Sequence, residues 1–194
     1  MIEFPITPHD VLSRLYQQVY IIHNICTENN IKYWLIGGSL LGQVRHGEII
    51  PHDDDCDVGI NIEDMIRLRT ILSKEALKHD MVVWNTEHGL KLKCTKNKGI
   101  GTDIFIYKLD HDSQKWILAM ETSIKAWPKD FFLNEELQNL QSVPFGESGY
   151  VMIPTNPLRY LYHLYGDNCM TVKKLDFNHL QNCKHINANI AVPL

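Results

Sequence analysis

The aspartates within positions 53–57 are the residues whose spacing most suggests chemistry, and there are four of them: Asp53, Asp54, Asp55 and Asp57. Apolar residues at 49–51, 58 and 60 flank the run, so we expect it at the mouth of a buried strand. In an extended chain, Asp55 and Asp57 project to the same face. Two carboxylates this close raise one pKa unless a cation neutralises them, and hard oxygen ligands suit Mg²⁺ or Mn²⁺. The alternative is a solvated acidic loop, which the apolar flanks disfavour.

A glycine-serine turn supplies the complementary half of such a site. Gly37, Gly38 and Ser39 stand between a predicted strand and a predicted short helix. Glycine lets the backbone approach a phosphate closely, and the amides at a helix N-terminus point toward it. Many strand-helix turns contain glycine, so the turn alone is a weak signal. The signal is stronger here because the acidic pair follows the turn closely, with Asp55 sixteen positions after Ser39. A phosphate-binding turn together with a metal site indicates phosphoryl transfer, in which catalysis is mostly positioning and charge neutralisation.

The elements that must position these residues follow from the pattern of apolar side chains. Helices are predicted over 7–30, with Thr7 as the capping hydroxyl, and over 40–44, 63–79 and 156–164. The third of these should bury one stripe of side chains, namely Met65, Leu68, Leu72 and Leu77. Strands are predicted over 33–36, 58–61, 81–84, 90–95, 102–108 and 116–119. After the last strand we expect a helix-rich remainder, so the order predicts a mixed α/β (α+β) domain with a central sheet flanked by helices.

The composition is that of one soluble globular domain over residues 1–194. Hydrophobic residues make up 44% of the chain and charged residues 22%, and the net charge of −4 argues against binding of duplex nucleic acid. Five scattered cysteines without a CxxC pair favour a reducing compartment. The N-terminus lacks the features of a signal peptide, and no apolar run approaches the roughly 20 residues of a membrane span. We therefore expect a cytoplasmic protein.

Two sets of motifs resemble those of a known family. The first set is Ile-Gly-Gly-Ser-Leu-Leu-Gly at 36–42, Arg-His-Gly at 45–47 and the segment 50–59 around the aspartates; the second set lies at 143–146, 153–154, 160–161 and 165–167. Together they resemble the LicD family of the nucleotidyltransferase (polymerase-β-like) superfamily, which includes bacterial phosphocholine transferases and fukutin-type ribitol-phosphate transferases. The chain is short for this family, and His52 stands where the family often has tryptophan.

The resemblance implies a nucleotidyltransferase fold, with a helical C-terminal part, and a metal-binding pair formed by Asp55 and Asp57. It also implies a third carboxylate from a neighbouring strand, for which Asp103 is our candidate; the alternative is an aspartate of an edge strand. Asp103 would complete the metal shell or accept the proton of the acceptor hydroxyl. The role of Asp53 is left open, and Asp54 should point away.

Arg45 and His46 are predicted to bind the donor diphosphate alongside Gly38 and Ser39, because arginine offers forked donors to phosphate oxygens. The alternative is a surface helix end whose cations compensate the helix dipole. Further participants are left open. They are Lys91 and Lys93, which share a strand face that we expect to be solvated, and Tyr162, Tyr165 and Asp167. One more candidate set consists of His179, Cys183 and His185, whose spacing is loosely that of zinc ligands. A fourth ligand is missing from this set.

The predicted function is transfer of a phosphorylated small alcohol, such as phosphocholine or an alditol phosphate, from a CDP-linked donor to a hydroxyl of a glycan or glycolipid. The resemblance implies this donor and this reaction. The closest alternative is a nucleotidyltransferase that attaches the nucleotide of an NTP, which the Arg45-His46-Gly47 segment disfavours. A non-catalytic nucleotide- or glycan-binding module is a further alternative, which the intact glycine-serine turn and aspartates disfavour.

Overall fold

The computed structural model describes residues 6–96 and 100–173, together with the pairs 177–178, 183–184 and 192–193. The proposed zinc ligands His179 and His185 lie outside the described residues, as does the side chain of Cys183. Two short strand pairs are formed near the C-terminus, by β10 (Val172–Lys173) with β13 (Val192–Pro193) and by β11 (Phe177–Asn178) with β12 (Cys183–Lys184).

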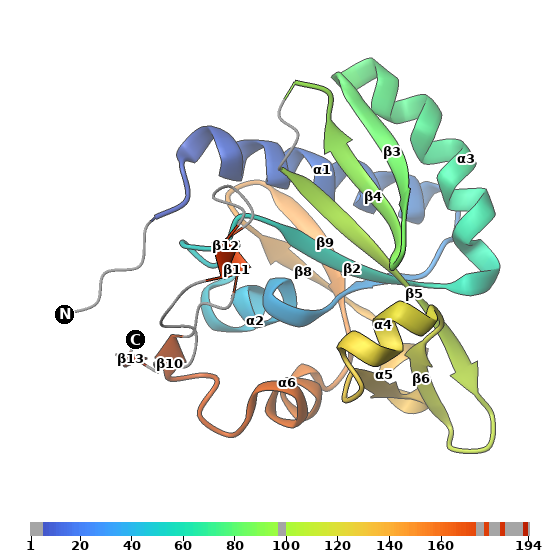
Figure 1. Cartoon of the computed structure of the whole chain (residues 1–194), viewed down its shortest axis with the longest axis vertical. Coiled ribbons are helices and arrows are strands. Elements are labelled where there is room, and N and C mark those ends of the chain that lie inside the picture. Colours follow the sequence, from blue (N-terminus) through green and yellow to red (C-terminus); the bar gives the residue numbers. More distant parts are fainter. Residues whose placement is uncertain (1–5, 97–99, 174–176, 179–182, 185–191, 194) are drawn as a thin grey trace.

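A mixed sheet forms the centre of the domain, as the sequence predicts (Figure 1). Its five main strands are, in spatial order, β1 (Tyr33–Leu35), β2 (Cys56–Asn61), β5 (Gly101–Asp110), β4 (Gly89–Cys94) and β3 (Met81–Thr86). β2 and β5 are parallel, whereas the other neighbours are antiparallel. The second half of β5 also pairs with β6 (Lys115–Leu118), which pairs with β7 (Phe131–Leu133).

Six α-helices surround this sheet within the described residues: α1 (His9–Glu28), α2 (Gly37–His46), α3 (Met65–Ala76), α4 (Glu121–Ala126), α5 (Asn134–Gln138) and α6 (Pro157–Tyr165). Short 3₁₀ turns at Ile62–Asp64 and Leu77–His79 flank α3. In Figure 1, α1 runs behind β3 and β4, while α2 and α6 lie close together below the sheet. Within the part of the chain that the structure describes, no helix is both long and apolar enough to span a membrane.

The strand register gives the sheet two chemically different faces. Cys56 pairs with Thr102, and Val58 pairs with Ile104, so these residues share one face, where all are buried. α1 lies on this face, because the Thr102 hydroxyl donates a 3.0 Å hydrogen bond to the side-chain oxygen of Gln18. The residues between them therefore point to the opposite face, which carries Asp57 and Asp103.

Three sequence predictions about the elements need correction. Thr7 does not cap α1; its hydroxyl donates instead to the carbonyl of Asp53 at 2.8 Å, which ties the N-terminal segment to the acidic run. Leu77 is 71% exposed because α3 ends at Ala76 and a 3₁₀ turn begins at Leu77, so the buried stripe ends at Ala76. The remainder of the chain, which was expected to be helix-rich, also contains a hairpin of β8 (Gln141–Phe145) and β9 (Gly149–Ile153).

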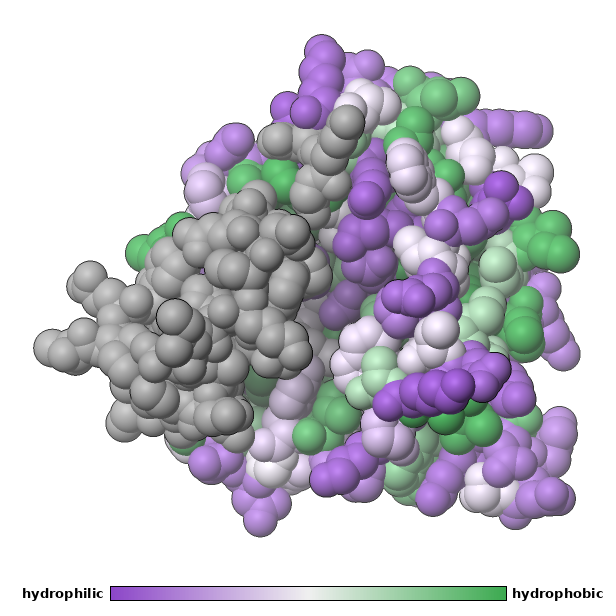
Figure 2. Space-filling view, viewed as in Figure 1, coloured by the Kyte–Doolittle hydropathy of each residue, from purple (hydrophilic) through white to green (hydrophobic). Residues whose placement is uncertain are grey.

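The exposed large apolar side chains come from several different elements. They include Ile66 on α3, Trp84 on β3, Tyr150 on β9 and Leu158 on α6. On the face seen in Figure 2, apolar residues are likewise interspersed among hydrophilic ones. Single apolar side chains of this kind are normal on a protein surface, and we assign no role to them.

Gly59 is a position where the packing allows no side chain. A Cβ atom there would lie 2.8 Å from the Trp34 ring and 3.0 Å from the Tyr107 ring, and both rings are buried. We predict that Gly59→Ala lowers the free energy of unfolding by about 1–3 kcal/mol, the usual cost of overpacking. Urea unfolding measures this change. Lys108→Ala, at an exposed position of β5, is the control and should stay within about 0.5 kcal/mol of the original protein. An equally small effect at Gly59 would contradict the packing described here.

Candidate active site

Three carboxylates converge at one end of the sheet. Asp55 immediately precedes β2, Asp57 is the second residue of that strand, and Asp103 pairs with Asp57 across the parallel β2–β5 ladder. One oxygen from each of the three lies within 4.8 Å of the others. The structure therefore brings together the three predicted metal ligands, and their function in metal binding remains a prediction.

The protein concentrates negative charge at this point. The pKa of Asp57 is raised well above its ordinary value, first by burial and then by the carboxylates of Asp55 and Asp103. Burial and Asp55 likewise raise the pKa of Asp53. Asp54 does not point away from this group as expected: it is only 2% exposed, and its carboxylate lies within 4.8 Å of those of Asp53 and Asp55. Such a cluster of hard oxygen ligands suits a divalent cation.

Lys91 partly balances this charge, although the sequence analysis expected it to be solvated. It lies opposite Asp103 in the β4–β5 ladder, and its Nζ is 2.5 Å from the Asp103 carboxylate. The side chains of Lys91 and Asp103 are only 12% and 17% exposed. Burial lowers the pKa of Lys91, but the charge and hydrogen bond of Asp103 outweigh that effect, so the pKa is raised and the lysine is charged. Lys93 lies 5.1 Å from the Trp84 ring centroid.

The glycine-serine turn forms the first turn of α2. Helical bonding begins with the Leu40 amide, which donates to the Ile36 carbonyl at 3.0 Å, so the preceding amides belong to the helix N-terminus. Amides in this position have no acceptor within their own helix. A Cβ at Gly38 would lie 2.9 Å from a carboxylate oxygen of Asp53, so a larger residue there would require the Asp53 side chain to shift. The turn and the acidic run are therefore in close contact.

Ser39 links the turn to β2. Its buried hydroxyl accepts a 2.8 Å hydrogen bond from the Asp57 amide and donates to the Cys56 thiol at 3.3 Å. The hydroxyl thus holds the backbone of an acid-bearing strand. Any contact of Ser39 with phosphate would be made by its backbone amide, and substrate binding by Gly38 and Ser39 remains a prediction.

α6 contributes two tyrosines to this region. The Gly37 amide donates to the Tyr160 hydroxyl at 3.2 Å. The Tyr165 hydroxyl is 3.5 Å from the position that a Cβ of Gly37 would occupy, and burial, followed by the charge of Asp57, raises the pKa of Tyr165. Of the C-terminal residues left open by the sequence, Tyr165 therefore lies beside the acids, whereas Tyr162 and Asp167 are exposed.

Arg45 and His46 stand at the other end of α2. Arg45 follows Gly38 by seven residues, which is about 10 Å along a helix axis. A guanidinium nitrogen of Arg45 donates to the Val172 carbonyl at 3.5 Å, so this side chain contacts the C-terminal segment, while His46 is exposed. Their role in diphosphate binding remains a prediction, and the geometry places them apart from the glycine turn.

A partly buried network around Asp130 was not predicted from the sequence. Its two carboxylate oxygens accept hydrogen bonds from Tyr107 at 2.7 Å and from Tyr160 at 3.1 Å. Burial raises the pKa of Asp130 to about 6. Asp130 follows Trp-Pro-Lys in an irregular segment, where no periodic pattern signals a half-buried acid. Tyr160 belongs to the C-terminal motif of the resemblance, and that was the one available signal.

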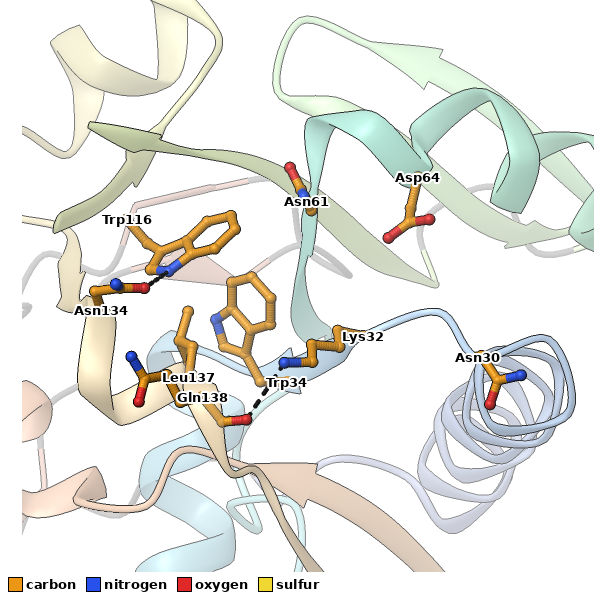
Figure 3. Close-up of a pocket in the computed structure, with 9 residues that line it drawn as sticks. All are labelled: Asn30, Lys32, Trp34, Asn61, Asp64, Trp116, Asn134, Leu137 and Gln138. Atoms are coloured by element: carbon orange, nitrogen blue, oxygen red, sulfur yellow. Dashed lines mark hydrogen bonds between the residues drawn. The ribbon is translucent and has the colours of Figure 1, made fainter. Parts of the chain in front are cut away.

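A separate cavity of about 300 Å³ lies at the far end of β2 (Figure 3). Trp34, Trp116 and Leu137 give it apolar walls, and polar residues complete the lining: Asn30, Lys32, Asn61, Asp64, Asn134 and Gln138. Two of these groups already have partners, since Trp116 donates to the Asn134 side chain and Lys32 to the Gln138 carbonyl. The cavity does not include the clustered aspartates, so we place the phosphoryl chemistry at the acids.

A family model described as LicD/FKTN/FKRP, nucleotidyltransferase domain, matches residues 30–156. The chain belongs to this LicD family. The match confirms the resemblance and extends from the turn before β1 through β9, so it includes the glycine turn, the acidic run and Asp103. α6, with Tyr160 and Tyr165, lies beyond the matched residues.

Relatives of this LicD chain include proteins of named activity. It is 38% identical over 152 residues to an uncharacterized protein of Rickettsia prowazekii (strain Madrid E), covering 78% of this chain and 53% of that protein. It is 40% identical over 70 residues to the human ribitol 5-phosphate transferase FKRP, covering 36% of this chain and 14% of that protein. It is 37% identical over 57 residues to the lipopolysaccharide cholinephosphotransferase LicD of Haemophilus influenzae, covering 29% of this chain and 22% of that protein. The chain thus spans about half or less of the length of these relatives.

The crowding of carboxylates leads to a prediction for Asp57→Asn. A saturating divalent ion stabilises a protein by about 2.7 kcal/mol at 100 times its dissociation constant, which is roughly 5–10 °C at this chain length. We expect Mn²⁺ to raise the melting temperature of the original protein by such an amount, and the Asn variant to lose that increase. Because the raised pKa of Asp57 means that its charge opposes folding, the metal-free variant should melt at or above the original temperature.

Asp112→Asn is the control for this measurement, because Asp112 is exposed and outside the cluster. It should keep the full response to Mn²⁺. A response that survives in Asp57→Asn would rule out this metal site.

Proposed function

We propose that the protein transfers a phosphorylated small alcohol from a CDP-linked donor to a hydroxyl of a glycan or glycolipid, using Mg²⁺ or Mn²⁺. The observation that carries the proposal is the close approach of the α2 turn to Asp57, whose carboxylate clusters with those of Asp55 and Asp103. The names of two relatives support the type of group, since one is a ribitol 5-phosphate transferase and the other a cholinephosphotransferase. The cytoplasmic location stays a prediction.

The three carboxylates fit a divalent ion because they are close, carry hard oxygens and repel one another. Asp55, Asp57 and Asp103 would hold the ion. When bound, it would neutralise phosphate charge and polarise a phosphoryl oxygen.

The chain's own groups would bind and orient the donor. Gly38 and Ser39 lie in the first turn of α2, close to Asp53 and Asp57, and their amides would bind phosphate there because a helix N-terminus favours negative charge. Lys91 adds a buried cation at the same place. In the transfer, the acceptor oxygen forms a bond to the β-phosphorus of the donor, the bond to the bridging oxygen breaks, and CMP leaves with that oxygen.

Asp103 would either complete the metal shell or accept the proton of the acceptor hydroxyl. Either role requires the ionised carboxylate, and the Lys91 ammonium lies 2.5 Å from it. We predict that Asp103→Asn lowers kcat by about 100-fold or more, in the range for loss of a general base, and changes donor affinity only modestly. Steady-state kinetics with a CDP-linked donor measures both.

Glu63→Gln is a control on an exposed acid near the other end of β2, and it should retain full activity. Near-normal kcat in Asp103→Asn would assign the role to another acid, such as Asp53.

The donor itself is predicted to be a CDP-linked alcohol. Calorimetry in Mg²⁺ with CDP-choline, CDP-ribitol, CDP-glycerol, ATP and CTP should show binding of at least one CDP-alcohol, with CMP as a product inhibitor. Mass spectrometry of the acceptor product should show an added alcohol phosphate. Binding of ATP or CTP alone, with a nucleotide attached to the product, would favour the nucleotidyltransferase alternative. Failure of every nucleotide to bind would favour a non-catalytic module.

A further inference from the structure

The Asp130 network reaches the glycine turn through one hydroxyl. Tyr160 donates its single hydroxyl hydrogen to Asp130, and its oxygen accepts the Gly37 amide at 3.2 Å. The three groups come from different segments, because Asp130 lies between α4 and β7, Tyr160 lies on α6, and Gly37 begins α2. A half-buried carboxylate is therefore connected to the first amide of the proposed phosphate-binding turn.

Gly37 is the residue at which the chain changes direction from β1 into α2. Its φ of +54° is a left-handed conformation that residues with a Cβ rarely adopt. A Cβ there would also lie 3.6 Å from an Asp57 oxygen, so the Gly37 backbone is close to the acids. Any rotation of this peptide would change the direction of the Gly38 and Ser39 amides that follow.

Tyr107 provides an internal comparison for Tyr160. Each tyrosine donates one hydroxyl hydrogen bond to Asp130, each is fully buried, and each ring packs against Phe132. Of the two hydroxyls, the one on Tyr160 accepts the Gly37 amide. If both hydroxyls served stability alone, removing either one would affect phosphate binding alike. If the Tyr160 hydroxyl positions the turn, removing it would weaken phosphate binding more than removing the Tyr107 hydroxyl.

We infer that Tyr160 and Asp130 are positioning residues, which hold the Gly37 amide and thereby direct the Gly38 and Ser39 amides toward a bound phosphate. The inference rests on the proposed function in taking the α2 turn as the phosphate-binding element. It also identifies the amides that would bind the anion. The Gly37 amide already donates to the Tyr160 hydroxyl, so the next two amides of the turn would hold the anion. The ionised form of Asp130 makes Tyr160 a stronger acceptor for Gly37, since a chain of hydrogen bonds polarises along its length.

The test uses inorganic pyrophosphate with MgCl₂ and the backbone amide resonances of ¹⁵N-labelled full-length protein. In the original chain, pyrophosphate should shift the Gly38 and Ser39 resonances in a saturable way. Tyr160→Phe should weaken pyrophosphate binding by about five- to tenfold, the size of one hydrogen bond, and should change the Gly37 resonance before any ligand is added. Tyr107→Phe, the matched control, should bind within about twofold of the original. Asp130→Asn should weaken binding in the same direction as Tyr160→Phe and is the second variant if that one does not fold.

Equal weakening by the Tyr160 and Tyr107 variants would overturn the inference, because it would show a structural role only. Unchanged binding in Tyr160→Phe, or no response of Gly38 and Ser39 in the original protein, would overturn it as well. The proposed function is tested separately by the CDP-alcohols. If none of them binds while pyrophosphate still gives the expected difference between variants, the donor assignment fails and the positioning role stands.

Discussion

Repulsion between three carboxylates is the constraint to which the rest of this site responds. Asp55, Asp57 and Asp103 have oxygens within 4.8 Å of one another, in a place where burial already disfavours charge. Lys91 supplies one positive charge against them through its short contact with Asp103. Further positive charge placed among these acids would lower their mutual repulsion. A divalent ion would supply it, and it would also attract the phosphates of a donor.

The backbone must hold these acids against their repulsion, and the opposite face of the sheet provides the means. β2 and β5 bury apolar residues such as Val58 and Ile104 on that face, and α1 covers it through the Gln18–Thr102 bond. Side-chain bonds to the acidic segment add to this: the Ser39 hydroxyl accepts the Asp57 amide, and Thr7 donates to the Asp53 carbonyl. Burial of apolar residues on one face of the sheet therefore offsets the free-energy cost of the charge on the other face. The contacts of the α2 turn keep the acidic segment in its orientation.

The features that sequence predicts are those set by local spacing. Alternation along a strand is enough to place Asp55 and Asp57 on one face, and glycine beside a predicted helix start is enough to suggest the α2 turn. Lys91 could not be assigned, because its partner depends on the register between β4 and β5, which the intervening loop decides. The contact of Thr7 with Asp53 and the approach of Asp130 to Tyr160 join segments 46 and 30 residues apart, and no periodicity encodes such contacts. The exposure of Leu77 was not predicted either, because it depends on the residue at which α3 ends.

The most direct test of this account is a crystal structure of the protein with Mn²⁺, with the metal located by its anomalous scattering. We expect one strong peak bounded by Asp55, Asp57 and Asp103, at about 2.1–2.2 Å from a carboxylate oxygen of each, close to the distances for hard divalent ions. We also expect the Lys91 ammonium to move away from the oxygen of Asp103 that binds the metal. A Mn²⁺ peak elsewhere, or none at these three aspartates at saturating metal, would contradict the central claim.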